Sequence, residues 1–291
     1  IWDSHIHLFT EEMAANPGEW AKTNSELVWA ACVSPPDRPS IQGWSTPDEL
    51  MRDMDGAGLE KVVLLGWYWE NADSCRLQNR FYADLLRRYP DRLLVFASIQ
   101  PGDPEVLDEI DRAQDAGFIG LGEIHPQAQD FTLEDSCWVR ILEHVADKGL
   151  PINLHVTDPD SPSYPGRVDT PLEPYLAMAS VWPNQVFILA HLGGGIPWKF
   201  KDRLKDLRKT QLYLDCSAAP LLYDSDILVR CAQSYGADRL LFGTDYPLRV
   251  FPKRQRRPEF AQMREWVQSS GLTEAELALV FNENAKRLFS A

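Results

Sequence analysis

Residues of metal-ligand type end a series of short apolar runs along this chain. His5 and His7 lie two residues apart in the first run, and later runs end in His155, His191 and Asp245. Because a strand alternates its side chains between two faces, residues two apart project to the same side and can hold one ion. Imidazole and carboxylate suit a divalent ion, with Zn²⁺ expected first and Mn²⁺, Fe²⁺ or Ni²⁺ as alternatives. The pattern predicts a site for one or two such ions.

A glutamate extends this set. Glu123 also ends an apolar run, and a carboxylate in that position is costly unless it is paired or coordinated. We expect Glu123 to be a metal ligand, with a salt bridge to an arginine or lysine as the alternative. His125 projects to the same side and is either a neighbour of the ligands or part of the loop structure. His144 falls in a predicted helix and is expected at the surface.

The elements that must position these residues are strands alternating with helices. Apolar, β-branched runs predict strands at 1–8, 61–66, 93–98, 118–124, 151–156, 185–191, 211–216 and 239–245. Windows with helical periodicity predict helices at 47–57, 77–89, 104–116, 133–148, 171–181, 199–207, 225–235, 258–269 and 274–289. Such an alternation implies an α/β fold with a parallel sheet. We expect a closed (β/α)8 TIM barrel, with an open doubly wound sheet as the alternative.

The long segments after the strands are expected to carry the substrate site, because in a barrel they meet at the carboxyl ends of the strands. Trp67, Tyr164, Arg167 and Arg249 are the predicted substrate-binding residues. A guanidinium group suits a carboxylate or a phosphate, although each arginine could equally be a surface cation. Other aromatic residues of these segments either wall an apolar pocket or pack the loops down: Trp20, Trp29, Trp44, Tyr68 and Trp69.

Composition limits the classes of partner. The chain has 291 residues, a formal net charge of −14 and five scattered cysteines. Its negative charge disfavours nucleic acid and anionic membranes, because binding to phosphate rests on Lys and Arg. The cysteines fit a reducing cytoplasm, and no apolar run approaches the ~18 residues of a membrane span. We expect one domain over residues 1–291 that opens on a strand and not on a leader peptide. The expected partner is a small-molecule substrate, and a homo-oligomer is compatible with the sequence.

One local exception to the acidic composition follows the last predicted strand. It consists of Lys253, Arg254, Arg256 and Arg257. This group is expected to be a solvated loop, with an anionic substrate or the acidic patch of another subunit as alternative partners.

Three motifs resemble the amidohydrolase superfamily, and specifically its amidohydrolase-related branch. They are Asp3-Ser4-His5-Ile6-His7, Ala190-His191-Leu192-Gly193-Gly194-Gly195 and Phe242-Gly243-Thr244-Asp245-Tyr246-Pro247. The resemblance implies that the first metal is bound by His5, His7, His155 and Asp245. It makes His191 either a ligand of a second metal or an acid/base that faces the substrate.

Glu123 departs from much of that superfamily, in which a carboxylated lysine at this point bridges two metals. Decarboxylases of the branch generally use one metal and no ligand there, whereas TatD-like hydrolases have a glutamate. If Glu123 binds a second ion, hydrolysis is favoured, and if it does not, decarboxylation is nearly as well supported.

The main functional prediction is a metal-dependent hydrolase of an ester, lactone or amide. Metal-bound water loses its proton near neutral pH. Asp245 would accept that proton and pass it to the leaving group, and His191 would polarise the carbonyl. The alternatives are a non-oxidative decarboxylase of a small carboxylic acid, a TatD-like phosphodiesterase and a barrel that serves only as a scaffold. The full ligand set argues against the scaffold.

Overall fold

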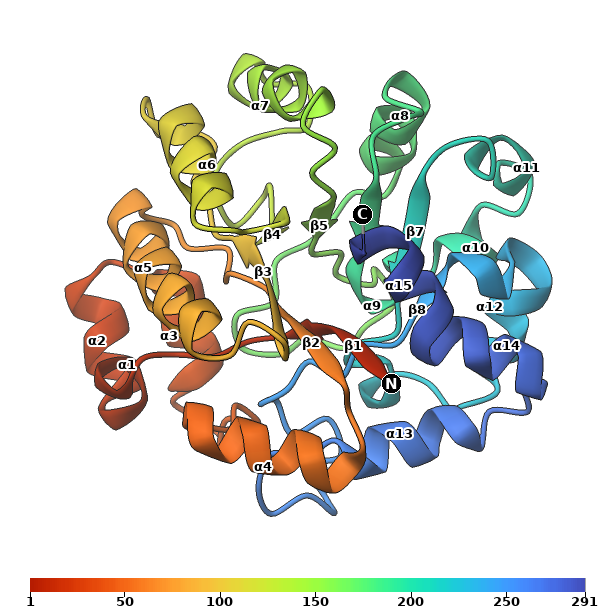
Figure 1. Cartoon of the computed structure of the whole chain (residues 1–291), viewed down its shortest axis with the longest axis horizontal. Coiled ribbons are helices and arrows are strands. Elements are labelled where there is room, and N and C mark those ends of the chain that lie inside the picture. The colour runs from red at the N-terminus through yellow and green to blue at the C-terminus, as the bar shows by residue number, and fades with distance from the viewer. Residues whose placement is uncertain (291) are drawn as a thin grey trace.

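The computed structural model describes residues 1–290 and has parallel strands at its centre with helices around them (Figure 1). Within these residues, eight strands follow one another around the sheet in chain order. They are β1 (Trp2–Ile6), β2 (Lys61–Leu64), β3 (Leu93–Ala97), β4 (Gly120–Ile124), β5 (Ile152–Leu154), β6 (Phe187–Leu189), β7 (Leu212–Asp215) and β8 (Leu240–Leu241).

Backbone contacts between the ends of the sheet make it a barrel. The Ser4 amide donates to the Phe242 carbonyl at 2.8 Å, and the Asp245 amide donates to the His5 carbonyl at 2.9 Å. Ile6 also forms a parallel bridge with Tyr246. These contacts join the segment around β8 to β1, so the predicted TIM barrel is confirmed and the open sheet is excluded.

Helices follow the strands and cover the outside of the barrel. The longer ones are α4 (Pro47–Ala57), α5 (Ala72–Arg88), α6 (Val106–Asp115), α7 (Ser136–Ala146), α8 (Glu173–Val181), α12 (Ile227–Tyr235) and α13 (Ala261–Gln268). The α4 bounds match the prediction because local signals fix both ends. Thr46 and Glu49 form a capping box, and Gly58 ends the helix with a left-handed φ of 71°.

Three predicted segments differ from the observed elements. The long loop expected after the first strand contains α1 (Glu11–Ala15), α2 (Pro17–Thr23) and α3 (Leu27–Val33). The helix expected at 199–207 is divided into α10 (Ile196–Lys199) and α11 (Leu204–Leu207), because Phe200 leaves the helical conformation at φ −125° and ψ 47°. The last helix runs as α14 (Glu274–Ala278), a π-helical turn η3 (Leu279–Glu283) and α15 (Asn284–Phe289).

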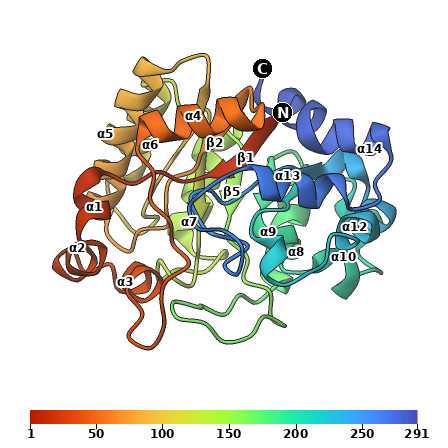
Figure 2. The same cartoon turned by 90° about the horizontal axis from the view of Figure 1, so that it is seen from below.

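Short elements complete the chain between these helices. They are α9 (Ala190–Gly193) and the 3₁₀ turns η1 (Ala219–Leu221) and η2 (Ala237–Arg239). Figure 2 shows the N-terminus near α4 and α13 at one end of the barrel and the loop that follows β5 at the opposite end. The loops after the strands therefore gather at the carboxyl ends, where barrel enzymes build their sites.

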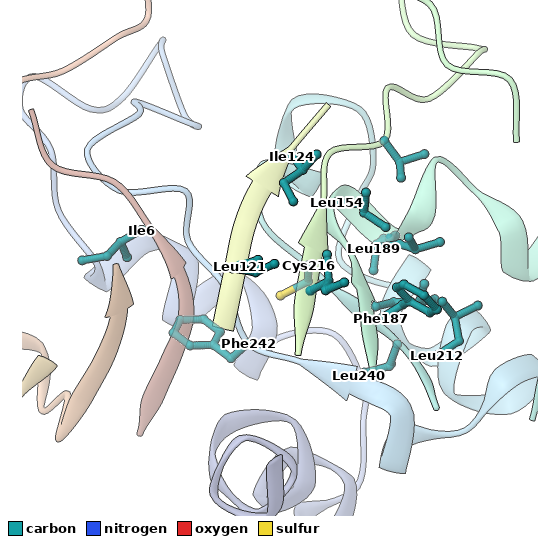
Figure 3. Close-up of a cluster of buried hydrophobic side chains, with 14 of the residues drawn as sticks. Ile6, Leu121, Ile124, Leu154, Phe187, Leu189, Leu212, Cys216, Leu240 and Phe242 are labelled. Atoms are coloured by element: carbon teal, nitrogen blue, oxygen red, sulfur yellow. The ribbon is translucent and has the colours of Figure 1, made fainter. Parts of the chain in front are cut away.

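Apolar strand residues buried on both faces hold the barrel together, as expected of a parallel sheet covered by helices. Ile124, Leu154 and Leu189 come from three neighbouring strands and belong to the largest buried cluster (Figure 3). Because these strands are packed on both sides, the side chains at their ends have fixed directions. Within residues 1–290, no helix has both the length and the apolar character needed to cross a bilayer.

Candidate metal centre and its cavity

The first group of potential ligands joins the two ends of the sheet. His5 and His7 extend from β1 and its end, are buried, and hold their Nε2 atoms 3.3 Å apart. Asp245 follows β8, and its Oδ1 lies 3.8 Å from His5 Nε2 and 3.6 Å from His7 Nε2. Separations of this size between donor atoms suit coordination of a common ion, because each metal–ligand bond is about 2 Å long.

A second group lies at the ends of the next strands around the barrel. Glu123 is in β4, His155 follows β5 and His191 follows β6. Oε1 of Glu123 lies 2.8 Å from His155 Nδ1 and 3.5 Å from His191 Nε2, and these two nitrogens are 3.2 Å apart. The three residues can also offer one donor atom each to a common ion.

The carboxylate of Glu123 connects the two groups. While Oε1 faces His155 and His191, Oε2 lies 3.8 Å from His5 Nε2 and 3.6 Å from His7 Nε2. Within residues 1–290, the ion-pair partners of Glu123 are histidines and not the arginine or lysine of the alternative interpretation. The structure thus brings all six predicted ligands together.

Hydrogen bonds behind three of the histidines leave their Nε2 atoms free for a metal. The Nδ1 atoms of His5, His7 and His191 donate at 3.0 Å to Asp215 Oδ2, the Leu65 carbonyl and the Ser217 carbonyl. A proton fixed on Nδ1 leaves the lone pair on Nε2, which is the tautomer that a metal requires. The donor set therefore fits a divalent metal ion.

The charges of the site favour a cation as well. Burial alone would lower the pKa of His5, but the carboxylates of Asp215 and Glu123 raise it to about 10. Burial would raise the pKa of Glu123, yet the imidazoles of His155 and His5 hold it well below its usual range. Several buried carboxylates are thus ionised together, and positive charge among them reduces the cost of their burial.

Asp215 is a functional residue that sequence reasoning missed. It ends β7, is fully buried, and accepts hydrogen bonds from His5 Nδ1, the Ser217 amide at 3.0 Å and Asn153 Nδ2 at 3.2 Å. The signal was present, because β7 ends in a ligand-type residue like the other strands. Its hydrogen bond to Nδ1 holds the ring of His5 on the side opposite the Nε2 atom.

A cavity of about 350 Å³ opens over the two ligand groups. Trp67 and Tyr164, two of the predicted substrate-binding residues, line it. The other two do not. Arg167 pairs with Asp169 and donates at 3.0 Å to Oγ of Ser161, which lines the cavity, but Arg167 itself does not line it.

Arg249 fixes a loop and does not line the cavity. It donates to the Ser40 carbonyl at 2.5 Å and to the Ile41 carbonyl at 3.4 Å, and Ser40 and Ile41 belong to the cavity wall. Among residues 1–290, Arg38 is the one arginine or lysine that lines the cavity. The basic group after β8 lies outside the wall, and its four arginine and lysine residues are exposed.

Most of the tryptophans expected near the site pack a loop against the barrel. Trp20, Trp29 and Trp69 are buried in one cluster with Phe9 and Met13. Trp67 packs against this cluster and also lines the cavity. His144 is half-buried on α7, one of the outer helices, where it pairs with Asp111 and is not one of the ligand groups.

Comparison with known proteins places this barrel in a family. A family model described as "Amidohydrolase" matches residues 2–291, so the chain belongs to the amidohydrolase family, as its motifs indicated. A gamma-resorcylate decarboxylase of Polaromonas sp. is 22% identical, over 83% of this chain and 86% of its own length. A gamma-resorcylate decarboxylase of Rhizobium radiobacter is 23% identical over the same shares.

Solved structures agree on the fold. A dihydroxybenzoic acid decarboxylase of Polaromonas sp. JS666, with bound manganese and the inhibitor 2-nitroresorcinol, has a TM-score of 0.73 at 20% identity and covers 99% of this chain and 96% of its own. A 5-carboxyvanillate decarboxylase of Sphingomonas paucimobilis has a TM-score of 0.76 at 17% identity, over 100% and 98%.

These relatives correct the functional prediction. The chain was expected to hydrolyse an ester, lactone or amide, but the curated relatives that match it are decarboxylases. The hydrolase interpretation is therefore wrong, and the alternative of a metal-dependent decarboxylase fits the relatives. Manganese is the metal named for the Polaromonas structure, so zinc gains no support from the comparison.

Proposed function

We propose that this chain is a metal-dependent, non-oxidative decarboxylase of a small hydroxylated aromatic carboxylic acid. The observation that carries the proposal is the cavity of about 350 Å³, which ends on metal-ligand groups and is walled by Trp67, Tyr68 and Tyr164. A pocket of this size suits a single substituted ring. The decarboxylases among its relatives support the same reaction class.

We further propose that the two ligand groups hold one or two divalent ions, with Mn²⁺ the first candidate because a structural neighbour binds it. Such an ion would act as a Lewis acid and hold the carboxylate or hydroxyl oxygen of a substrate. His5, His7 and Asp245 form one proposed set, and His155 and His191 form the other. Glu123, with one oxygen toward each set, would offer a ligand atom to either set.

The reaction breaks the bond between the ring carbon and the carboxylate. The electron pair stays on the ring carbon, CO₂ leaves, and the ring carbon takes up one proton. Asp245 is the proposed proton carrier, because its carboxylate lines the cavity and is partly accessible, with 12% of the side chain exposed. His191 also lines the cavity, and its hydrogen bond to the Ser217 carbonyl would keep its Nε2 available as a ligand of the ion.

The remaining features support a small-molecule enzyme that consists of one catalytic domain over residues 1–291. All strands of the described residues lie in one sheet, and the family model covers nearly the whole chain. The free cysteines, Cys32, Cys75, Cys137, Cys216 and Cys231, support a reducing compartment such as the cytoplasm.

Release of CO₂ from 2,6-dihydroxybenzoate and from 5-carboxyvanillate, measured with Mn²⁺-loaded protein, tests the proposal. We expect turnover of one of these acids and a loss of about 100-fold or more in kcat for Asp245→Asn, since the amide cannot carry the proton. Asp202→Asn, at an exposed position, is the matched control. Absence of CO₂ release with metal bound would refute decarboxylation of this class, and full turnover by Asp245→Asn would remove its proton role.

Metal content per chain tests the ligand assignment separately. Mass spectrometry on wild type and on Glu123→Ala should show fewer ions in the variant, because each oxygen of Glu123 faces one ligand group. Equal content in both proteins would place Glu123 outside the metal centre, whatever reaction the enzyme catalyses.

A further inference from the structure

His125 is a buried imidazole with no partner of its own. It follows β4, is 1% exposed, and lines the cavity beside the ligand groups. Among residues 1–290, neither Nδ1 nor Nε2 of His125 has a hydrogen-bond partner. Leaving a buried polar group unpaired costs free energy, so native structures rarely contain one without a reason.

The backbone around His125 is firmly held. The His125 amide donates to Gln129 Oε1 at 3.1 Å. Gln129 Nε2 in turn donates to the Trp69 carbonyl at 3.0 Å and the Ile99 carbonyl at 2.8 Å. A buried side chain thus ties the turn after β4 to the segments that follow β2 and β3, which fixes the place of the unpaired ring.

Two other rings contact the ring of His125. His155 stacks on His125 with centroids 4.7 Å apart and planes at 16°, and Tyr68 meets it edge to face at 5.2 Å. Stacking leaves the two nitrogens at the edge of the ring as the groups that can bind a ligand, and each of them donates or accepts a hydrogen bond according to the tautomer.

We propose that His125 is a specificity residue that binds a hydroxyl group on the ring of the aromatic acid. This inference rests on the proposed function. A hydroxyl group can both donate and accept, so it can pair with an imidazole nitrogen in either tautomer, whereas a carboxylate only accepts and is better matched by a guanidinium group. A site built to bind a hydroxyl discriminates strongly against an analogue without it, because the buried nitrogens are then left unpaired.

Two substrates that differ by one hydroxyl test the proposal: 2,6-dihydroxybenzoate and 2-hydroxybenzoate. With Mn²⁺-loaded wild type we expect kcat/KM to favour the dihydroxy acid by about 30-fold or more. In His125→Phe, which keeps a ring to stack on His155, the preference should fall to about threefold, mainly through KM for the dihydroxy acid. His125→Asn, which keeps a donor and an acceptor, should restore part of the preference.

Metal per chain and thermal stability are measured on each variant, with His144→Asn as the control because His144 lies outside the site. A His125→Phe protein that keeps its metal and the full preference overturns the hydroxyl-binding role. Loss of metal in that variant also overturns it and makes His125 a support for the ligand group. Absence of CO₂ release from these two acids and from 5-carboxyvanillate by metal-loaded wild type refutes the proposed function itself, whereas release from 5-carboxyvanillate alone overturns only the preference for the second hydroxyl.

Discussion

Side chains that hydrogen-bond to the proposed metal ligands determine how those ligands are oriented. Asp215 is the main example, because its Oδ2 accepts the Nδ1 proton of His5 while its Oδ1 accepts from the Ser217 amide. Burial would raise the pKa of Asp215, but neighbouring His5 and the hydrogen bonds lower it. An ionised carboxylate at this place keeps the lone pair of His5 on Nε2, toward the proposed metal.

Replacing this carboxylate should weaken metal binding. In Asp215→Asn we expect the affinity for Mn²⁺ to fall about 10–100-fold, as is usual when the group that orients a ligand is lost. Competition with a chelating dye measures the affinity. Asp202→Asn should leave it unchanged, and an Asp215→Asn protein with wild-type affinity would show that His5 is oriented without this contact.

The site residues that could be predicted are those that lie at the ends of strands. His5, His155 and Asp245 could be placed because parallel strands end at one face of a barrel. Arg167 and Arg249 could not be placed, because their partners belong to long loops whose paths the local sequence does not determine. Glu123 could be located but did not reveal the reaction, since a carboxylate ligand serves many metal enzymes.

Among the elements, β1 and the segment after β8 approach each other closely. A Cβ added to Gly243 would lie 2.8 Å from His5 Cβ, closer than real contacts allow. Because His5 and Asp245 belong to the same ligand group, any separation of these two segments also separates the ligands. Glycine at this point permits the close approach that the site needs.

Gly243→Ala should therefore disturb stability and metal binding together. We expect a loss of about 1–3 kcal/mol in the free energy of unfolding, as for overpacked cores, and weaker Mn²⁺ affinity. Urea denaturation with and without metal measures both effects. Gly56→Ala is the control, since its added Cβ on α4 meets nothing within 4 Å and should stabilise the helix by about 1 kcal/mol. Unchanged metal affinity in Gly243→Ala would mean that the contact can yield without moving the ligands.

Elements with strong local signals were predicted best. The cap at Thr46 and Gly58 fixed α4, and apolar runs located every strand. The helices after β1 were missed because each is short and is stabilised by burial of residues such as Met13 and Trp29 in a distant cluster. Packing of that kind leaves little trace in the local sequence.

For the whole molecule, metal binding and folding are coupled, because the ligands come from both ends of the sheet. Removal of metal with a chelator should lower the midpoint of thermal unfolding by about 4–8 °C, since a ligand at 100 times its Kd adds about 2.7 kcal/mol. Differential scanning fluorimetry measures the shift. The double variant His7→Ala, Asp245→Asn should show a smaller shift if these residues bind an ion, and an undiminished shift would show that they do not.

The barrel could be predicted from the alternation of strands and helices over the whole chain, because this pattern has few other stable solutions. The reaction could not be predicted from the sequence. Imidazole and carboxylate donors at the mouth of a barrel serve hydrolysis and decarboxylation alike, and the choice depends on how the cavity holds the substrate. Residues that line the cavity, such as Arg38 and His125, come together only in the folded chain.

The packing of the tryptophans has an optical consequence. Trp20, Trp29 and Trp69 lie with ring centroids 5.1–5.4 Å apart, and Trp67 is 6.4 Å from Trp69. Excitation energy passes readily between indoles at such distances, so the cluster absorbs and emits as a coupled group. Trp67 also lines the cavity, and an aromatic molecule bound there would quench the emission of the whole group. The loop that walls the site thus gives the protein an intrinsic fluorescent reporter of its occupancy.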